Sequence, residues 1–214
     1  MILGGEALVK AFTSGTFRAF VDGKLVDDPT GRLRIGPNSV DVSLGRVFLR
    51  PKVQAEVADP FDPASLDWEE IEVGEEGIVL GRGHDPFLLG TVRERFEVDD
   101  ALAIEERLTT AEGEQTRTRE AVFAPFYEGR STCGRLGIAS HVTAGFGDYQ
   151  FRGAFTLELF TVLPAPIRLY PGMRIGQVSF CEIYQPSRYE GAYSGTNHYE
   201  RPVRPALGRD RFLS

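Results

Sequence analysis

The stretch AFTLELFTV, residues 154–162, predicts a single β-strand in which a glutamate lies between two leucines. Because side chains alternate between the two faces of a strand, Glu158 shares one face with Thr156 and Phe160. Two more strand-like stretches with a Pro-Gly turn between them follow within residues 167–181 and predict another strand pair. The segment therefore predicts β-structure and places one carboxylate on a largely apolar strand.

Short strands punctuated by glycine and proline continue on the N-terminal side of this segment. Apolar or alternating runs occur at 39–44, 46–49 (ending at Pro51), 77–80 and 86–92. Such frequent short strands predict a mostly β fold, an antiparallel barrel or a distorted sandwich. Residues 6–20 have helical apolar spacing that breaks near Gly15, which predicts a short N-terminal helix.

Three segments lack the pattern of a core element. Residues 57–76 are rich in Asp, Glu and Pro and are predicted to be a surface excursion. The very polar segment 105–119 is predicted to be an insertion that forms a protruding hairpin or a mobile loop. From residue 185 the composition changes to a tail with few aliphatic residues. We therefore expect one domain, residues 1–184, followed by the tail, 185–214.

Composition restricts the classes of function. The net charge of −7 over 214 residues argues against an extended nucleic-acid-binding face, although a local arginine cluster can still bind a small anion. Cys133 and Cys181 lie in apolar runs far apart in sequence and are expected to be buried thiols. The N-terminus lacks the features of a signal peptide, and no segment has the roughly 18 apolar residues that span a bilayer. These observations predict a cytoplasmic protein.

The stretch YEGRSTCGRLGI, residues 127–138, has the chemistry of a phosphate site. Two guanidinium groups and two hydroxyls lie within six residues, beside glycines that allow backbone amides to approach a ligand. Taken alone, the stretch is equally well explained as a solvated turn with surface arginines. Likewise, Glu158 alone is explained as a glutamate paired with a structural arginine.

Several motifs in a fixed order resemble the dCTP deaminase family of the dCTP deaminase and dUTPase superfamily. That family has the motifs E-G-R/K-S-S, R-L-G, H-x-T-A-G-F-x-D, T-L-E-L and P-G-M-x-I-G-Q. This chain has EGRS, RLG, HVTAGFGD, TLEL and PGMRIGQ, starting at 128, 135, 141, 156 and 171. IGPNSVDVSLG at 35–45 and FLLGT at 87–91 extend the resemblance, which covers about residues 35–180.

The resemblance implies a dUTPase-type β-barrel or sandwich that forms a homotrimer, and it implies a role for each matched residue. Glu158 would be the general base that activates a water for attack on C4 of cytosine. Ser131 and Arg135 would place this water and stabilise the developing charge, and Ala144 would contribute its backbone carbonyl. The substrate-binding residues would be Arg130, Ser131 and Thr132 at the phosphates and Asp148 at the 3′-hydroxyl.

The tail corresponds to a flexible lid over residues 185–214, in which Tyr189 fits the family's first lid tyrosine. His198 stands where the family has a lysine, which weakens phosphate neutralisation at neutral pH, although arginines of the tail can compensate. The turn at 147–153 lacks the family's Pro-Gly pair and looks somewhat like the dUTPase version.

Zinc-dependent cytosine deaminases need H-x-E with P-C-x-x-C, and the sequence has neither. We therefore expect no zinc, with Mg²⁺ only as the companion of the triphosphate. His141 is expected to pack or hydrogen-bond beneath the site.

Three functions stay open from the sequence. The first is the deamination of dCTP to dUTP and ammonia, a step toward dUMP and dTTP. The second is dUTP pyrophosphatase activity, alone or coupled to deamination with dUMP as product, and the third is a nucleotide-binding regulatory protein on the same scaffold. The resemblance also makes dTTP a candidate inhibitor. Retention of Glu158, Ser131 and Arg135 favours the deaminase, since a binder has no use for a water-activating carboxylate.

Overall fold

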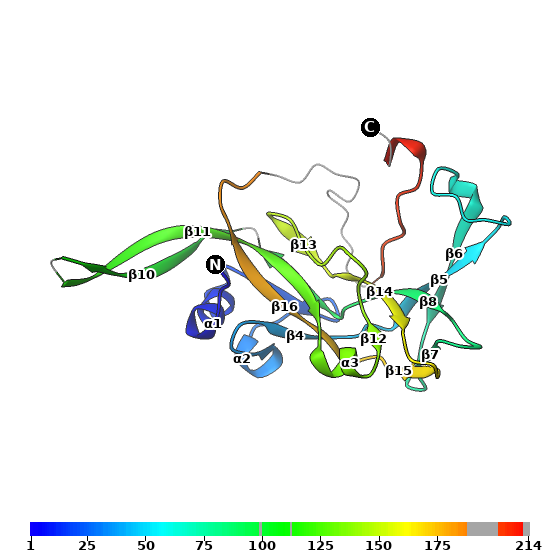
Figure 1. Ribbon diagram of the computed structural model, residues 1–214. Helices are drawn as coiled ribbons and strands as arrows, with labels where there is room; N and C mark the ends of the chain where they lie inside the picture. Colours follow the sequence, from blue (N-terminus) through cyan, green and yellow to red (C-terminus); the bar gives the residue numbers. More distant parts are fainter. Residues whose placement is uncertain (99, 112, 188–200, 212–214) are drawn as a thin grey trace.

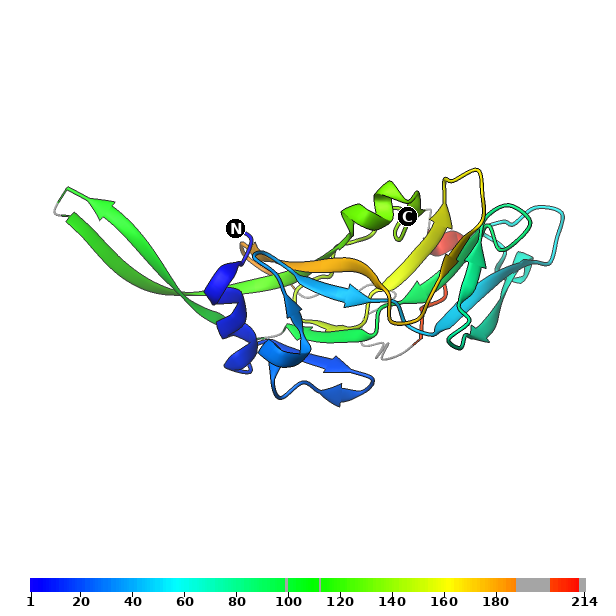
Figure 2. The same cartoon turned by 90° about the horizontal axis from the view of Figure 1, so that it is seen from below.

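A computed structural model describes residues 1–98, 100–111, 113–187 and 201–211. Its main body is formed by curled antiparallel sheets (Figures 1 and 2). One sheet has the strand order β10 (Leu102–Thr110), β11 (Gly113–Gly129), β16 (Arg174–Ile183), β4 (Val40–Ser43) and β3 (Arg34–Ile35). A second has the order β12 (Ile138–Ala139), β14 (Thr156–Thr161), β8 (Phe87–Thr91), β5 (Val47–Val53) and β6 (Leu66–Glu72).

The remaining strands form a third sheet and a short ribbon. The third sheet has the order β13 (Phe151–Gly153), β9 (Glu94–Val98), β1 (Arg18–Val21) and β2 (Lys24–Leu25), and the ribbon consists of β15 (Ile167–Leu169) and β7 (Ile78–Leu80). The helical elements are α1 (Gly5–Thr13), α2 (Pro29–Arg32) and α3 (Ser131–Arg135), with 3₁₀ turns at Pro63–Ser65 and Arg209–Arg211. The predicted mostly β fold with a short N-terminal helix is confirmed.

Phenylalanines join the first sheet, the third sheet and α1 into one core. The members of this cluster, all buried, are Phe12, Phe17, Phe96, Phe123 and Phe180. Their ring centroids lie 5.0 to 6.2 Å apart, mostly in edge-to-face or tilted arrangements. Such aromatic pairs add to the stabilisation from burial of their area. α1 ends close to Gly15, as predicted, because that residue takes a φ of +77°.

The 105–119 segment is a hairpin that projects from the body (Figure 1). β10 and β11 pair from Leu102 opposite Ala121 outward to Thr110 opposite Gly113. At its base Arg119 binds two glutamates, Glu106 on β10 and Glu182 on β16. Of the two predicted forms, hairpin or mobile loop, the structure has the hairpin.

Three local expectations are wrong. Residues 57–76 include β6, whose Trp68 is buried against Leu49 and Leu89, so the segment is not merely a surface excursion. β5 does not stop at Pro51 but continues to Val53. Pro51 lies within the pairing of β5 with β6, opposite Trp68, so this proline does not end the strand.

The third error concerns strand pairing. The two strands predicted within 167–181 do not pair with each other, because β15 pairs with β7 whereas β16 pairs with β11 and β4. A Pro-Gly turn therefore joins two sheets here instead of forming a hairpin.

Candidate functional site

Glu158 occupies the middle of β14 on the predicted face. Leu157 and Leu159 are fully buried on the opposite face, whereas Glu158 is partly exposed. The backbone N–H of Val142 donates to Oε2 of Glu158 at 2.5 Å, and the N–H of Glu158 donates to the carbonyl of Ser140 at 3.2 Å. Within the described parts of the chain, Oε1 of Glu158 has no hydrogen bond. One carboxylate oxygen is therefore fixed and the other is available to a ligand.

The segment 140–147 holds Glu158 in place and is itself attached to β11. The buried hydroxyl of Tyr127 donates to Oγ of Ser140 at 2.8 Å. The N–H of Tyr127 donates to the carbonyl of Gly145 at 2.6 Å, and the N–H of Gly147 donates to the carbonyl of Pro125 at 2.8 Å. Burial raises the pKa of Tyr127 far above its ordinary value, so its hydroxyl remains a donor. These bonds make residues 140–147 a rigid neighbour of β11.

Close packing around Tyr127 explains two features of this region. An added Cβ at Gly176 would lie 2.4 Å from the hydroxyl oxygen of Tyr127, so the P-G-M-R-I-G-Q turn needs a glycine there. The His141 ring packs edge-to-face on Tyr127 at 5.6 Å between centroids. His141 therefore packs in the way the sequence led us to expect.

The phosphate-type motif forms the end of β11 and the short helix α3. Ser131, Thr132 and Arg135 are exposed on α3, and among the described residues Arg135 has no ion pair. Arg130, by contrast, donates to Oδ2 of Asp41 at 2.7 Å. α3 is followed by β12, which pairs directly with β14 opposite residues 160 and 161. The structure thus brings α3, the 140–147 segment and Glu158 to one region of the fold.

Other predicted residues lie at or beyond the margin of this region. Ala144 and Asp148 are exposed, and Asp148 opens a turn in which its carbonyl accepts from the N–H of Phe151 at 3.1 Å. Gln150 takes a left-handed φ of +64° in this turn, where the family pattern has glycine. Tyr189 and His198 lie outside the described residues.

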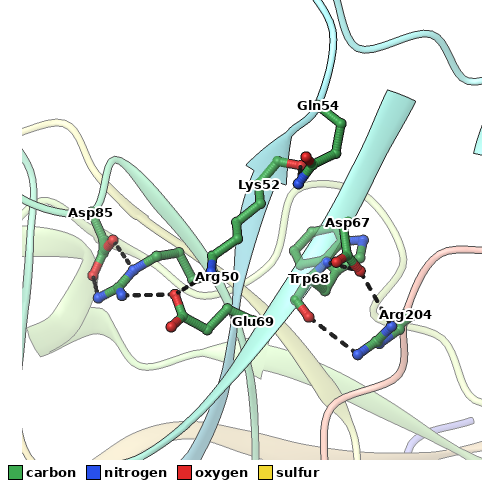
Figure 3. A network of polar contacts seen from close by, with 8 residues as sticks. All are labelled: Arg50, Lys52, Gln54, Asp67, Trp68, Glu69, Asp85 and Arg204. Atoms are coloured by element: carbon green, nitrogen blue, oxygen red, sulfur yellow. Dashed lines mark hydrogen bonds and ion pairs between the residues drawn. The ribbon is translucent and has the colours of Figure 1, made fainter. Parts of the chain in front are cut away.

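The described part of the tail lies against β6 and β14. The N–H of Val203 donates to Oγ1 of Thr156 at 3.0 Å, on the same strand face as Glu158. Arg201 binds both carboxylate oxygens of Glu70 at 2.6 and 2.8 Å. Arg204 donates to the carbonyl of Trp68 at 3.1 Å (Figure 3). Residues 201–211 therefore pack on the body, with Pro202 buried, although they add little to its core.

Ion pairs centred on Arg50 hold β5 and β6 together. Arg50 binds both oxygens of Asp85, at 2.6 and 2.8 Å, and donates to Glu69 at 3.2 Å (Figure 3). Hydrogen bonds from Arg50 and then Lys52 lower the pKa of Glu69. By strand register Glu70 shares the sheet face of Glu158, whereas Arg50 and Glu69 lie on the opposite face, so this network is not part of the Glu158 region.

Two charged residues that the motifs contain received no role from the sequence. Asp41 and Arg174 lie beside Arg130, and Arg174 donates to the same Oδ2 of Asp41 at 3.2 Å. Only the pairing of β4 with β16, which places Asp41 opposite Gln177 and Arg174 opposite Ser43, brings these residues together. Asp41 and Arg174 can therefore be found from the sequence only if the pairing of β4 with β16 is predicted.

Among the described residues, no group of three or more His, Cys, Asp and Glu side chains is placed to hold a metal ion. Both cysteines are free thiols; the expected burial is confirmed for Cys133 and is wrong for Cys181, which is partly exposed. In the same residues, no helix has the length and apolar character to cross a bilayer.

Comparison with known proteins gives consistent matches. The model of a family described as dCTP deaminase-like matches residues 13–111 and 108–183, two segments that meet in the projecting hairpin. A dUMP-forming dCTP deaminase of Coprothermobacter proteolyticus is 35% identical over 201 residues, which cover 91% of each chain. A dCTP deaminase of Natronomonas pharaonis is 36% identical, over 86% of this chain and 84% of its own.

A solved structure supports the fold independently. The crystal structure of the 2′-deoxycytidine 5′-triphosphate deaminase from Agrobacterium tumefaciens superposes with a TM-score of 0.51 at 19% identity. The superposition covers 84% of this chain and 47% of that longer one.

Proposed function

The chain belongs to the dCTP deaminase-like family, and from this premise we propose that it hydrolyses dCTP to dUTP and ammonia. The observation that carries the proposal is the arrangement of Glu158. Its Oε2 is held by the Val142 amide, and its Oε1 faces no partner among the described residues. A carboxylate fixed in this way can accept a proton from a water molecule that attacks C4 of the cytosine.

The chemical step balances within this site. Water adds to C4 while Glu158 takes one of its protons and passes it to N3, which gives a tetrahedral intermediate with a hydroxyl and an amino group on C4. The C4–N4 bond then breaks as Glu158 transfers the proton of that hydroxyl to the leaving nitrogen, so that ammonia departs and the C4 carbonyl and N3–H of uracil remain. In our proposal Ser131, Arg135 and the carbonyl of Ala144 orient the water and stabilise the developing charge.

Substrate binding is assigned to exposed groups around α3. Arg130, Ser131 and Thr132 bind phosphate oxygens, and Asp148 binds the 3′-hydroxyl. Tyr189 and His198 belong to the tail that covers the nucleotide. Mg²⁺ enters with the triphosphate as part of the substrate complex and neutralises part of its charge. We propose no zinc in the reaction.

Assembly and location are also proposals. We propose a homotrimer with sites between subunits. Large apolar side chains exposed on the site elements support this: Leu136, Val142, Phe146, Val162 and Leu163. A cytoplasmic location suits the two free cysteines, and dTTP is a candidate inhibitor at the same site.

A second product has specific support. Relatives from Coprothermobacter proteolyticus and Dictyoglomus thermophilum, each 35% identical, are named dUMP-forming. In that case the site would also hydrolyse the bond at the α-phosphorus and release pyrophosphate.

Separate incubations with dCTP and dUTP test both proposals. Ammonia with dUTP from dCTP, and no reaction of dUTP, is the expected result. Ammonia with dUMP and pyrophosphate from dCTP would establish the second product instead. If dCTP yields no ammonia, both proposals are wrong: dUMP and pyrophosphate from dUTP would then indicate a pyrophosphatase alone, and no reaction of either nucleotide would favour the regulatory, nucleotide-binding alternative.

A further inference from the structure

Two arginines share one carboxylate beside the phosphate-type motif. Arg130 follows β11 and Arg174 begins β16, and both donate to Oδ2 of Asp41 on β4, at 2.7 and 3.2 Å. Because both bind the same oxygen, the two guanidinium groups are close neighbours. Residues from three separate strands thus form a charged cluster at the start of α3, and the cluster carries two positive charges against one negative.

Backbone contacts fix the place of Arg174 relative to α3. The N–H of Arg130 donates to the carbonyl of Ile175 at 3.3 Å, and Sγ of Cys133 contacts the carbonyl of Arg174 at 3.5 Å. The register of β16 against β4 shifts between Arg174 and Gly176. Such a bulge re-aims the side chain at its position. Arg174 is therefore directed to the phosphate-type motif by a rigid local backbone.

The side chains of Asp41, Arg130 and Arg174 differ in how exposed they are. The side chain of Asp41 is 21% exposed and that of Arg130 is 25% exposed, whereas that of Arg174 is 46% exposed. An ion pair as open as the one made by Arg174 contributes little to stability. Its remaining N–H donors, however, are accessible to a ligand. The cluster keeps an excess positive charge, which favours an anion with several oxygens.

We propose that Arg174 binds the triphosphate of dCTP together with Arg130, and that Asp41 is the positioning residue that holds both guanidinium groups. The inference rests on the proposed function and adds a substrate-binding residue to it. Arginine keeps its positive charge at all ordinary pH values, so Arg174 adds a permanent cation to this cluster.

The test compares Arg174→Gln with Arg82→Gln as a matched control. Arg82 is exposed in the loop after β7 and, among the described residues, makes no ion pair. With dCTP as substrate, loss of Arg174 should raise KM about tenfold and leave kcat within about twofold, the effect of losing a charge-assisted contact that is partly exposed. The KM of Arg174→Lys, which keeps the positive charge but not the two-pronged guanidinium group, should lie between the KM values of Arg174→Gln and Arg82→Gln.

Inorganic tripolyphosphate separates this inference from the proposed function. As a competitive inhibitor, or as a ligand in calorimetry if the chain does not deaminate dCTP, it should bind about tenfold more weakly to Arg174→Gln than to Arg82→Gln. Equal KM values for dCTP and equal tripolyphosphate affinities in the two variants would overturn the assignment. Absence of ammonia release by the unmodified protein would refute only the proposed deamination.

The positioning role of Asp41 has its own test. If Asp41 holds Arg174, the effect of Arg174→Gln on KM should fall to about threefold or less in an Asp41→Asn background, because coupled residues do not act additively. The full, roughly tenfold effect in that background would show that Arg174 does not depend on Asp41.

Discussion

Tyr127→Phe should destabilise the protein and slow deamination through one buried hydrogen bond. The hydroxyl of Tyr127, whose residue is 1% exposed, donates to Oγ of Ser140, whose residue is 3% exposed, at 2.8 Å. Removing the Tyr127 hydroxyl breaks this buried hydrogen bond and leaves the buried Oγ of Ser140 without its donor, which costs about 1–2 kcal/mol of folding free energy. For a chain of this size that corresponds to a Tm about 2–8 °C lower.

The same bond reaches Glu158 through the 140–147 segment. The carbonyl of Ser140 accepts from the N–H of Glu158, and Val142 binds the Glu158 carboxylate two residues later. A looser Ser140 should therefore displace the proposed base, and we expect kcat to fall about three- to tenfold with KM for dCTP little changed. Thermal unfolding at one fixed protein concentration and steady-state ammonia release measure the two effects.

Tyr170→Phe is the matched control, because Tyr170 is 48% exposed and its hydroxyl has no hydrogen bond among the described residues. In the double variant of Tyr127→Phe with Ser140→Ala, the loss of stability should be smaller than the sum of the single losses, since both polar partners are then gone. A Tyr127→Phe variant with the Tm and kcat of the Tyr170→Phe control would refute the reasoning.

Three further outcomes are expected. Deleting the tail after Gln185 should raise KM and lower kcat without unfolding the body; an unfolded or fully active truncation would contradict the lid. Activity in zinc-free buffer should survive a zinc-selective chelator and respond to Mg²⁺. The proposal would be overturned by stoichiometric zinc that is lost and regained together with activity. Such zinc would be expected if Cys133, His141 and Cys181 of different chains formed a shared site. Burial raises the pKa of Glu94 above 4.5, so the folded state binds the proton more tightly. The stability of the unmodified protein relative to Glu94→Gln should therefore fall as pH rises above about 4.5; parallel Tm curves would contradict this.

How far the sequence predicts the fold depends on which pattern carries the signal. β14 was predictable because apolar and polar side chains alternate along it and its leucines are buried. β6 was missed because four of its seven residues are acidic, so that composition concealed the strand that buries Trp68. The pairing of β15 and β16 was wrong because a Pro-Gly turn fixes only the local chain direction, whereas partners distant in sequence determine the sheet.

The site was predictable to the extent that its motifs are local. Tyr127 and the residues that follow it, the 141–148 loop and β14 do come together around Glu158. Asp41 and Arg174 were missed as a pair because 133 positions separate them and only strand pairing makes them neighbours. The roles of Ser131, Arg135, Ala144 and Asp148 stay predictions, since they depend on how a nucleotide binds.

The role of Glu158 as the general base is tested most directly by the rate at which Glu158→Gln releases ammonia from dCTP, together with the affinity of this variant for dCTP. The amide keeps the shape of the side chain and the Val142 hydrogen bond but cannot take a proton from water. We expect unchanged dCTP binding and a fall in kcat of about 10²–10⁴-fold, the range typical of a general base. A variant that keeps more than about a tenth of the original turnover would contradict the assignment of Glu158 as the base.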